Sequence, residues 1–293
     1  MSMVAMKNSR PFEITSLDQD AALIRKQAKS QGYIFVKDLI PSADLLKLRR
    51  EITAVCARHH LLDASQDSVE GIALPGRPVV EGVDEEYKTY YGDIQKLRSF
   101  HAMAHHPTLL KLLSDLFEED VLIHPRNILR TIFPSLPQYS TPPHQDKYYV
   151  KGTSETWTAW IPCGDCPGEL GPLAVIHGSH QQGILATREA SGAGGRQSII
   201  NEDSVWACGD FACGDCLLVH SLCIHQGRDN ITENCIRFSL DFRYQPLSHP
   251  VHASSMEKPH LDFLDWEDIY RAWPENDPLK YYWQGLPLKL RHD

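Results

Sequence analysis

Short apolar runs rich in β-branched and aromatic residues fill the second half of the chain, and this pattern limits the possible folds most. Between residues 120 and 245 the runs read VLIH, NILRTIF, TWTAWI, LAVIH, CLLVH and IRFSLDFRY, and Gly, Pro, Asp and Asn separate them. Such short runs predict the strands of a sandwich or closed barrel, because βαβ units would place long helical segments between them. We therefore expect a mainly β protein with flanking helices and a core of the double-stranded β-helix type (jelly roll, cupin-like).

The segments on either side of this core have a different pattern. Residues 12–118 carry apolar positions at helical spacing, most clearly in 17–31, 43–60 and 107–117, and are expected to wrap the core as helices. Residues 246–293 mix loops with short helical stretches and are expected to form a C-terminal flap. No repeat or low-complexity tract divides the chain, so we expect all of it to form one domain.

Composition and charge exclude several classes of partner. The formal net charge is −9, and no run of five or six basic residues occurs. Nucleic acids and anionic membranes both need clustered Lys and Arg, so neither is expected as a partner. No apolar stretch of about 18 residues is present, and the N-terminus lacks the apolar core of a signal peptide. We expect a cytoplasmic protein with a small-molecule substrate, and the sequence does not predict its oligomeric state.

Four of the eight cysteines form two CxxC pairs, Cys163 with Cys166 and Cys213 with Cys216. Two such pairs can build a structural zinc site. Here the spacing between the pairs is longer than in the usual zinc module, and the second pair leads directly into the apolar run CLLVH. Free thiols are therefore the favoured interpretation for a cytoplasmic protein of this length.

A stronger candidate for metal binding is the segment TPPHQDKYYV, which contains His144 and Asp146. Residues two apart in an extended segment project from the same face. His225, in VHSLCIHQGRDN, is the best candidate for a third ligand. Two histidines and one carboxylate on one face of a metal are typical of non-haem iron(II) oxygenases. The same ligand types would serve a zinc enzyme, so a cupin-like metal-dependent lyase or hydrolase remains an alternative.

Arg237 follows His225 after a segment rich in turn-forming residues. If the chain reverses around Ile231, residues 225 and 237 become cross-strand partners with Cβ atoms about 4.5–5.5 Å apart. The guanidinium would then bind the distal carboxylate of a dicarboxylate that chelates the metal through its keto-acid end. Ser239 shares the same face and could donate a further hydrogen bond. The alternation fits a solvated strand face equally well.

The chain also resembles the phytanoyl-CoA dioxygenase family of 2-oxoglutarate oxygenases. The resemblance is carried, in the correct order, by GYIFVKDLIPSADLLKLRREI, HQD, WTAWIPCGDCPGELGPLAVIHGSH, GDCLLVHSLCIHQGRDN and RFSL. It implies iron(II), 2-oxoglutarate and O₂ as cofactor and cosubstrates. The implied reaction is hydroxylation of a C–H bond in a small organic molecule, with release of succinate and CO₂. The motifs look most like those of bacterial hydroxylases of secondary metabolism.

The resemblance also implies individual roles. It implies that His144, Asp146 and His225 bind the iron, that Arg237 binds the distal carboxylate of 2-oxoglutarate, and that Trp160 packs beside the cosubstrate. A role for Trp160 as an ordinary core residue is equally compatible with the sequence, because most buried tryptophans are core residues. The family's halogenating branch has a small residue in place of the aspartate, so the presence of Asp146 favours hydroxylation.

Two further residues are candidates for the wall of the site. Arg130 shares a strand face with Ile128 and Ile132, where a charge is unfavourable unless it is paired. We expect it either to meet the cosubstrate or a substrate carboxylate, or to form a structural ion pair. Thr141 is a second candidate wall residue. A catalytically silent relative that only binds metal or metabolite is the alternative to an enzyme, and the intact ligand set argues against it.

Overall fold

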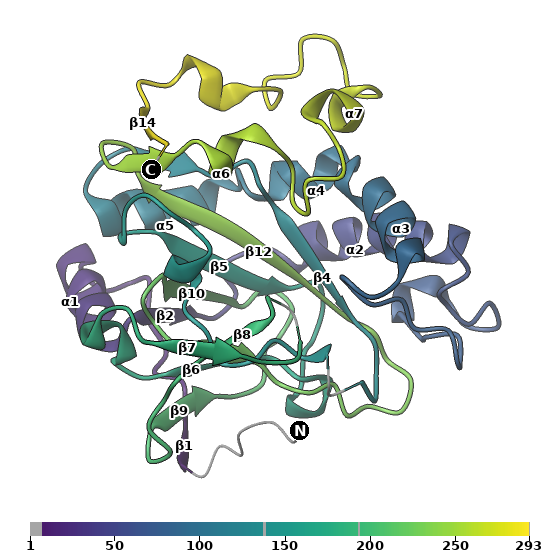
Figure 1. Cartoon of the computed structure of the whole chain (residues 1–293), viewed down its shortest axis with the longest axis horizontal. Helices are drawn as coiled ribbons and strands as arrows, with labels where there is room; N and C mark the ends of the chain where they lie inside the picture. The colour runs from purple at the N-terminus through teal and green to yellow at the C-terminus, as the bar shows by residue number, and fades with distance from the viewer. Residues whose placement is uncertain (1–7, 137–138, 193, 293) are drawn as a thin grey trace.

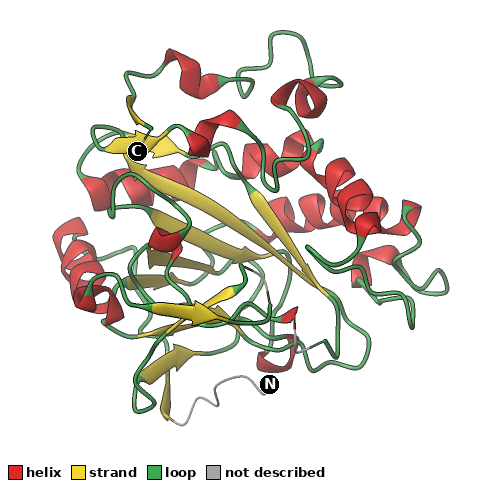
Figure 2. Ribbon diagram, viewed as in Figure 1, coloured by secondary structure: helices red, strands yellow, loops and turns green. Residues whose placement is uncertain are grey.

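A computed structural model of the chain describes residues 8–136, 139–192 and 194–292. Two sheets face each other, as expected for a jelly roll (Figure 2). The larger sheet has the order β2-β10-β5-β12-β3, with β4 also paired to β12, and the smaller has the order β1-β9-β6-β11. The larger sheet consists of β2 (Tyr33–Val36), β3 (Val121–Ile123), β4 (Ile128–Ile132), β5 (Trp157–Pro162), β10 (Cys216–His220) and β12 (Arg237–Pro246). The smaller sheet consists of β1 (Asn8–Pro11), β6 (Leu173–Ile176), β9 (Val205–Cys208) and β11 (His225–Gly227).

Helices cover the outer face of the larger sheet. Those before the core are α1 (Ala21–Gln31), α2 (Ser42–Arg58), α3 (Glu85–Gln95), α4 (Arg98–Met103) and α5 (Pro107–Phe117). After the core come α6 (Ser254–Glu257), α7 (Trp266–Tyr270) and two parallel strands, β13 (Pro250–His252) and β14 (Lys289–Arg291). Within the core segment, β7 (Thr187–Glu189) and β8 (Arg196–Ser198) form a separate antiparallel pair. None of the helices within the described ranges is long and apolar enough to cross a membrane.

Local sequence explains where the predicted helices begin and end. α1 ends at Gly32, whose φ of 77° places it in the left-handed region that glycine adopts without strain. α5 carries Pro107 in its first turn, where a missing backbone N–H is not needed. The N-terminal segment also contributes strands, because β1 belongs to the smaller sheet and β2 to the larger sheet. The division of the chain into three segments of one domain stays a prediction.

Side chains alternate along β12, the long strand that crosses the molecule between β5 and β4 (Figure 1). One face packs in the helix-covered core and consists of Phe238, Leu240, Phe242 and Tyr244. The opposite face points into the space between the sheets and consists of Arg237, Ser239, Asp241 and Arg243. Two of these polar residues are buried, since Arg237 is 4% exposed and Ser239 is 0% exposed, while Asp241 and Arg243 are half-buried.

The predicted hairpin between His225 and Arg237 is wrong. β11 pairs with β6, so that His225 lies opposite Val175, whereas β12 pairs with β4 and places Arg237 opposite Ile132. The connecting segment crosses from the smaller to the larger sheet instead of reversing within one ladder. Asn230 stabilises this crossing, because its side-chain Nδ2 donates to the Ile132 carbonyl at 3.0 Å. Both residues still point into the space between the sheets.

The CxxC cysteines do not come together as ligands. Cys163 and Cys216 belong to the helix-covered core, and Cys166 lies in the apolar cluster between the sheets. Within the described part of the chain, the one group of histidine, cysteine and acidic side chains that could hold a metal is His144, Asp146 and His225. The two CxxC pairs therefore contribute packing at these positions.

Candidate metal centre

The three predicted ligands converge between the two sheets. One ligand atom from each of His144, Asp146 and His225 lies within 4.8 Å of the others. The two histidines are joined by an antiparallel backbone bridge, in which His144 N–H donates to the His225 carbonyl at 2.9 Å and His225 N–H donates to the His144 carbonyl at 3.0 Å. Gln145 has extended backbone angles, so its two neighbours point to the same side.

Gln145 anchors this segment from the opposite side. Its side chain is buried, and its Nε2 donates to the carbonyls of Gly183 at 2.8 Å and Leu222 at 2.7 Å. Its Oε1 accepts a hydrogen bond from Leu185 N–H at 2.8 Å. These three bonds fix the position of the His-Gln-Asp segment, and sequence reasoning had assigned no role to Gln145.

Hydrogen bonds also determine which ring nitrogen each histidine offers. His144 Nδ1 lies 2.8 Å from the Pro142 carbonyl, and His225 Nδ1 lies 3.0 Å from the Cys223 carbonyl. A carbonyl oxygen only accepts, so each Nδ1 carries the proton and each Nε2 keeps its lone pair. Burial, followed by the nearby His225, lowers the pKa of His144 to about 3. The His144 ring is therefore neutral at neutral pH and able to bind a metal.

Two residues that the sequence reasoning missed hold the aspartate. Thr158 Oγ1 donates to Asp146 Oδ2, and the Arg243 guanidinium donates to Oδ1 at 3.3 Å. Burial alone would raise the pKa of Asp146, but the Arg243 charge and the Thr158 hydroxyl hold it well below its ordinary value. Asp146 is therefore a carboxylate. A signal for Thr158 existed, since it is a polar residue on an otherwise apolar strand and shares a face with Trp160.

The donor set fits iron(II). Two neutral imidazoles and one carboxylate lie on one side of a common point and leave further coordination positions open, as in the facial triad of non-haem iron oxygenases. His144, Asp146 and His225 would hold the iron.

A recess of about 40 Å³ lies beside these ligands and is lined by Arg237 and Trp160 among others. Arg237 is buried and donates to the Gly171 carbonyl, but its Nε has no partner. Ser239 Oγ is likewise buried and without a partner. No carboxylate of the described residues forms an ion pair with Arg237, and a buried unpaired cation is unfavourable. The recess therefore suits a bound carboxylate such as the distal end of 2-oxoglutarate.

The structure places two other predicted residues on the wall of this recess. Trp160 is 2% exposed, and the Arg237 Cζ lies 6.0 Å from its ring centroid. The same ring packs edge-on against Phe211 with centroids 4.7 Å apart. Trp160 therefore lines the recess and is also part of the apolar cluster between the sheets. Thr141 lines the recess and both larger cavities next to it. Their roles toward a cosubstrate stay predictions.

Arg130 forms the structural ion pair that was one of its two predicted roles. Its NH1 lies 2.8 Å from Glu81, and its Nε lies 3.1 Å from Asp241. Burial would lower the pKa of Arg130, but the two carboxylates raise it above its ordinary value, so it stays charged. Glu81 was missed because it lies in a loop without any hydrophobic period. Arg130 also lines the recess, and its contact with a ligand stays a prediction.

The jelly roll and this ligand set together define a non-haem iron oxygenase centre. Residues 28–239 match the phytanoyl-CoA dioxygenase (PhyH) family, and the chain belongs to that family. It is therefore a 2-oxoglutarate-dependent oxygenase that uses iron, which confirms the predicted fold, enzyme class and cofactors.

Individual relatives agree with this membership. The chain is 28% identical over 253 residues to 1-deoxypentalenic acid 11-beta-hydroxylase of Streptomyces arenae, a match that covers 80% of this chain and 85% of the relative. The fold is similar to that of the epimerase SnoN from nogalamycin biosynthesis, with a TM-score of 0.56, 16% identity, and coverage of 79% of this chain and 84% of SnoN. It is also similar to the carbocyclase SnoK from the same biosynthesis, with a TM-score of 0.55, 16% identity, and coverage of 82% and 89%.

Proposed function

We propose that this chain hydroxylates a C–H bond of a small organic molecule. One atom of O₂ enters the substrate as a hydroxyl group and the other enters succinate, while 2-oxoglutarate loses CO₂. The observation that carries the proposal is the position of the buried Arg237, whose Nε has no partner, in a recess beside the three metal ligands. A chain that only bound a metal, or a metal-dependent lyase or hydrolase, would have no need for a buried carboxylate-binding recess at this point.

Each side chain then has a stated task. His144, Asp146 and His225 hold iron, and Arg237 with Ser239 binds the distal carboxylate of 2-oxoglutarate. When bound, iron and 2-oxoglutarate supply the oxidising power that removes a hydrogen atom from the substrate and returns a hydroxyl group.

The surrounding residues orient these groups and keep water out. Thr158 and Arg243 keep Asp146 ionised and fix the direction of its carboxylate. Trp160 and Thr141 line the recess. Arg130 also lines it and is held in place by its ion pairs with Glu81 and Asp241. We propose that the whole chain acts as one catalytic domain, with residues 246–293 contributing to the substrate cavity through Leu261.

Relatives support a substrate from secondary metabolism. The relative from Streptomyces arenae is a hydroxylase of 1-deoxypentalenic acid, and SnoN has been solved in complex with Fe³⁺, alpha ketoglutarate and nogalamycin RO. SnoN is an epimerase and SnoK a carbocyclase, so the fold accommodates more than one outcome. Analysis of the oxidised product therefore distinguishes hydroxylation from these reactions.

The proposal is tested by following succinate formation from 2-oxoglutarate in the purified chain with Fe(II) and O₂. We expect slow turnover even without substrate, and its loss in His144→Ala, Asp146→Ala and Arg237→Ala. Asp203→Ala, which removes an exposed carboxylate, is the matched control and should keep turnover. Unchanged succinate formation in Asp146→Ala would refute the assignment. Activity that persists without O₂ and 2-oxoglutarate would instead favour a metal-dependent lyase or hydrolase.

A further inference from the structure

Two neighbouring cavities of about 380 Å³ each lie near the metal centre, and both are of substrate size. They share five lining residues, which are Glu81, Arg130, Thr141, Gly194 and Leu261. Only the first cavity is lined by His144 and Asp146. We call this first cavity the polar chamber and the second the apolar chamber, because the rest of their linings differ in chemistry.

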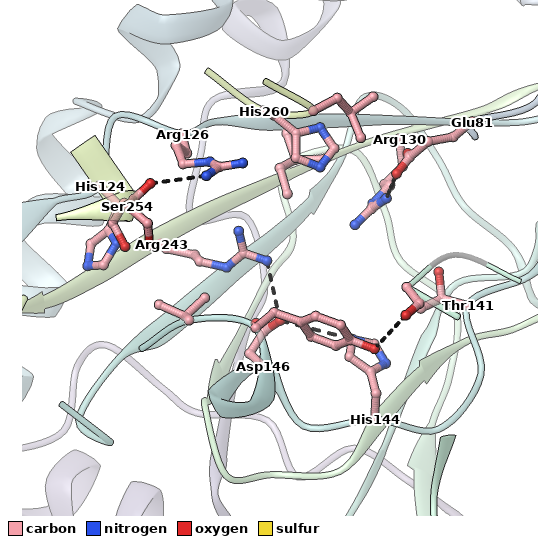
Figure 3. Close-up of a pocket in the computed structure, with 16 residues that line it drawn as sticks. Glu81, His124, Arg126, Arg130, Thr141, His144, Asp146, Arg243, Ser254 and His260 are labelled. Carbon is pink, nitrogen blue, oxygen red and sulfur yellow. Dashed lines mark hydrogen bonds and ion pairs between the residues drawn. The ribbon is translucent and has the colours of Figure 1, made fainter. Parts of the chain in front are cut away.

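Arg126 and Arg243 give the polar chamber its character. Arg126 lies in the turn between β3 and β4, and Arg243 lies on the interior face of β12. Figure 3 shows both guanidinium groups reaching into the chamber, with Arg243 between Arg126 and Asp146. Burial lowers the pKa of Arg126, and the like charge of Arg243 adds to that lowering.

Both guanidinium groups have hydrogen-bonding capacity to spare. A guanidinium carries five N–H donors. Among the described residues, Arg243 donates one hydrogen bond, to Asp146, and its buried Nε has no partner. Arg126 donates to the Ser254 carbonyl at 3.0 Å and pairs at 3.0 Å with Asp262, whose side chain is 61% exposed.

Arg130, the third arginine that lines the polar chamber, has different partners. Arg130 is bound by the two carboxylates of Glu81 and Asp241. Among the described residues, Arg243 forms an ion pair with Asp146 alone, and that carboxylate is also needed by the metal. Two like charges facing one chamber repel each other unless an anion lies between them. The polar chamber is therefore suited to receive an anionic group.

The apolar chamber is lined mainly by aliphatic and aromatic side chains. They include Val79, Val80, Val83, Ile132, Phe133 and Leu136. Burying apolar ligand surface against such a wall is favourable. Among the described residues that line it, the charged ones are Arg130 and Glu81, which pair with each other.

We propose that the substrate is an amphipathic carboxylic acid, with its carboxylate between Arg126 and Arg243 and its apolar body in the apolar chamber. The planar forks of the two guanidinium groups match a carboxylate. The metal ligands line the polar chamber, so the carbon that is oxidised lies in the part of the substrate next to the carboxylate. This inference rests on the proposed function for the claim that the bound acid is the molecule oxidised.

The test is calorimetric titration of the full chain, loaded with Fe(II) and 2-oxoglutarate, under anaerobic conditions. The probes are decanoate with decanamide, and adamantane-1-carboxylate with adamantane-1-carboxamide, so that each acid has a neutral partner of the same shape. We expect at least one acid to bind about tenfold or more tightly than its amide, as charge-assisted bonds to a carboxylate require. Arg126→Met should reduce this preference to about twofold or less, and Arg126→Lys to an intermediate value.

Arg271→Met is the matched control, because Arg271 directly follows α7 and its side chain is 77% exposed, and it should keep the full preference. Equal binding of acid and amide in both pairs, a preference that survives in Arg126→Met, or displacement of 2-oxoglutarate by the acid would each overturn the inference. The wild-type comparison of acid with amide does not depend on whether the variants fold. Selective binding of acid by a chain that never forms succinate would refute the proposed function instead, whereas succinate formation without acid preference would refute only this inference.

Discussion

The main chains of His144 and His225 pair directly with each other, and their rings lie with centroids 4.2 Å apart. Two ligands far apart in the chain are therefore positioned by backbone hydrogen bonds and not by flexible loops. Their Nδ1 atoms are both held by backbone carbonyls, so the Nε2 atoms are oriented before a metal arrives. Such preorganisation reduces the ordering that metal binding would otherwise require.

Substituting Arg237 by Gln should weaken 2-oxoglutarate binding strongly. The variant loses a buried cation that would pair with a carboxylate, an interaction whose disruption costs about 3 kcal/mol, or roughly 100-fold in the KM for 2-oxoglutarate. Ser239→Ala should raise this KM only about fivefold, as expected for the loss of one hydrogen bond from an uncharged donor. Arg50→Gln, on the exposed face of α2, is the control. A KM for 2-oxoglutarate that stays within about threefold in Arg237→Gln would contradict the role of Arg237.

Removing the Thr158 hydroxyl should weaken iron binding without unfolding the protein. Thr158→Val deletes the donor to Asp146 Oδ2, and loss of such a contact to a metal ligand typically lowers metal affinity by about tenfold or more. Thr53→Val removes a similarly buried hydroxyl, which donates to the Arg50 carbonyl in α2, and serves as the control. The measurement is Fe(II) competition against a chromophoric chelator. Equal iron affinities in the two variants would show that Thr158 does not position Asp146.

The ion pair between Glu81 and Arg130 should contribute to stability. Glu81→Gln leaves Arg130 with one of its two carboxylates, and breaking a buried pair in this way costs about 3 kcal/mol in the free energy of unfolding. Glu85→Gln disrupts a pair with Lys88 on the exposed face of α3 and should cost about 0.5 kcal/mol or less. Chemical denaturation of both variants gives the comparison. Similar losses in the two would indicate that the Glu81 pair is effectively solvated.

Buried histidines should make the protein sensitive to mild acid. Burial lowers the pKa of His101 and His124 to about 4 and that of His260 to about 3. The unfolded chain takes up these protons near pH 6.5, whereas the folded chain does so only below about 4. The free energy of unfolding should therefore fall as the pH drops from about 6.5 toward 4, by roughly 1.4 kcal/mol per pH unit for each histidine.

Denaturation of His124→Gln at several pH values isolates one of these contributions. The pH dependence in this variant should be shallower than in the wild type by about 1.4 kcal/mol per pH unit. His292→Gln, which replaces an exposed histidine, should leave the slope unchanged. Identical slopes for the wild type and His124→Gln would mean that His124 binds its proton equally in the folded and unfolded states, which would contradict the lowered pKa.

Some of these features could be predicted from the sequence because they depend on local patterns. Alternation of apolar and polar residues on β12 placed Arg237 and Ser239 on one face, and the His-x-Asp spacing placed His144 and Asp146 together. The sheet to which each strand belongs depends on long-range pairing. For that reason the hairpin linking residues 225 and 237 was predicted wrongly, although the two residues do face the same space.

Other site residues have no local signal at all. Glu81 and Arg126 lie in loops, and their position beside the metal centre follows only from the packing of those loops against β4 and the C-terminal segment. The alternation along β12 places Arg243 on the same face as Arg237. Its contact with Asp146, however, depends on how the distant segment that contains Asp146 packs against the sheet. Motif spacing therefore predicts the ligands better than it predicts the residues that support them.

The central claim is that His144, Asp146 and His225 bind one iron on which Arg237 orients 2-oxoglutarate. Its most direct test is an anaerobic titration of the purified chain with Fe(II) and 2-oxoglutarate, followed through the visible charge-transfer band of an iron(II)–2-oxo acid chelate. We predict that the band saturates at one equivalent of each per chain, is absent in His225→Ala, and needs far more 2-oxoglutarate in Arg237→Gln. A wild-type chain that forms no such band, or a His225→Ala variant that forms it undiminished, would contradict the account.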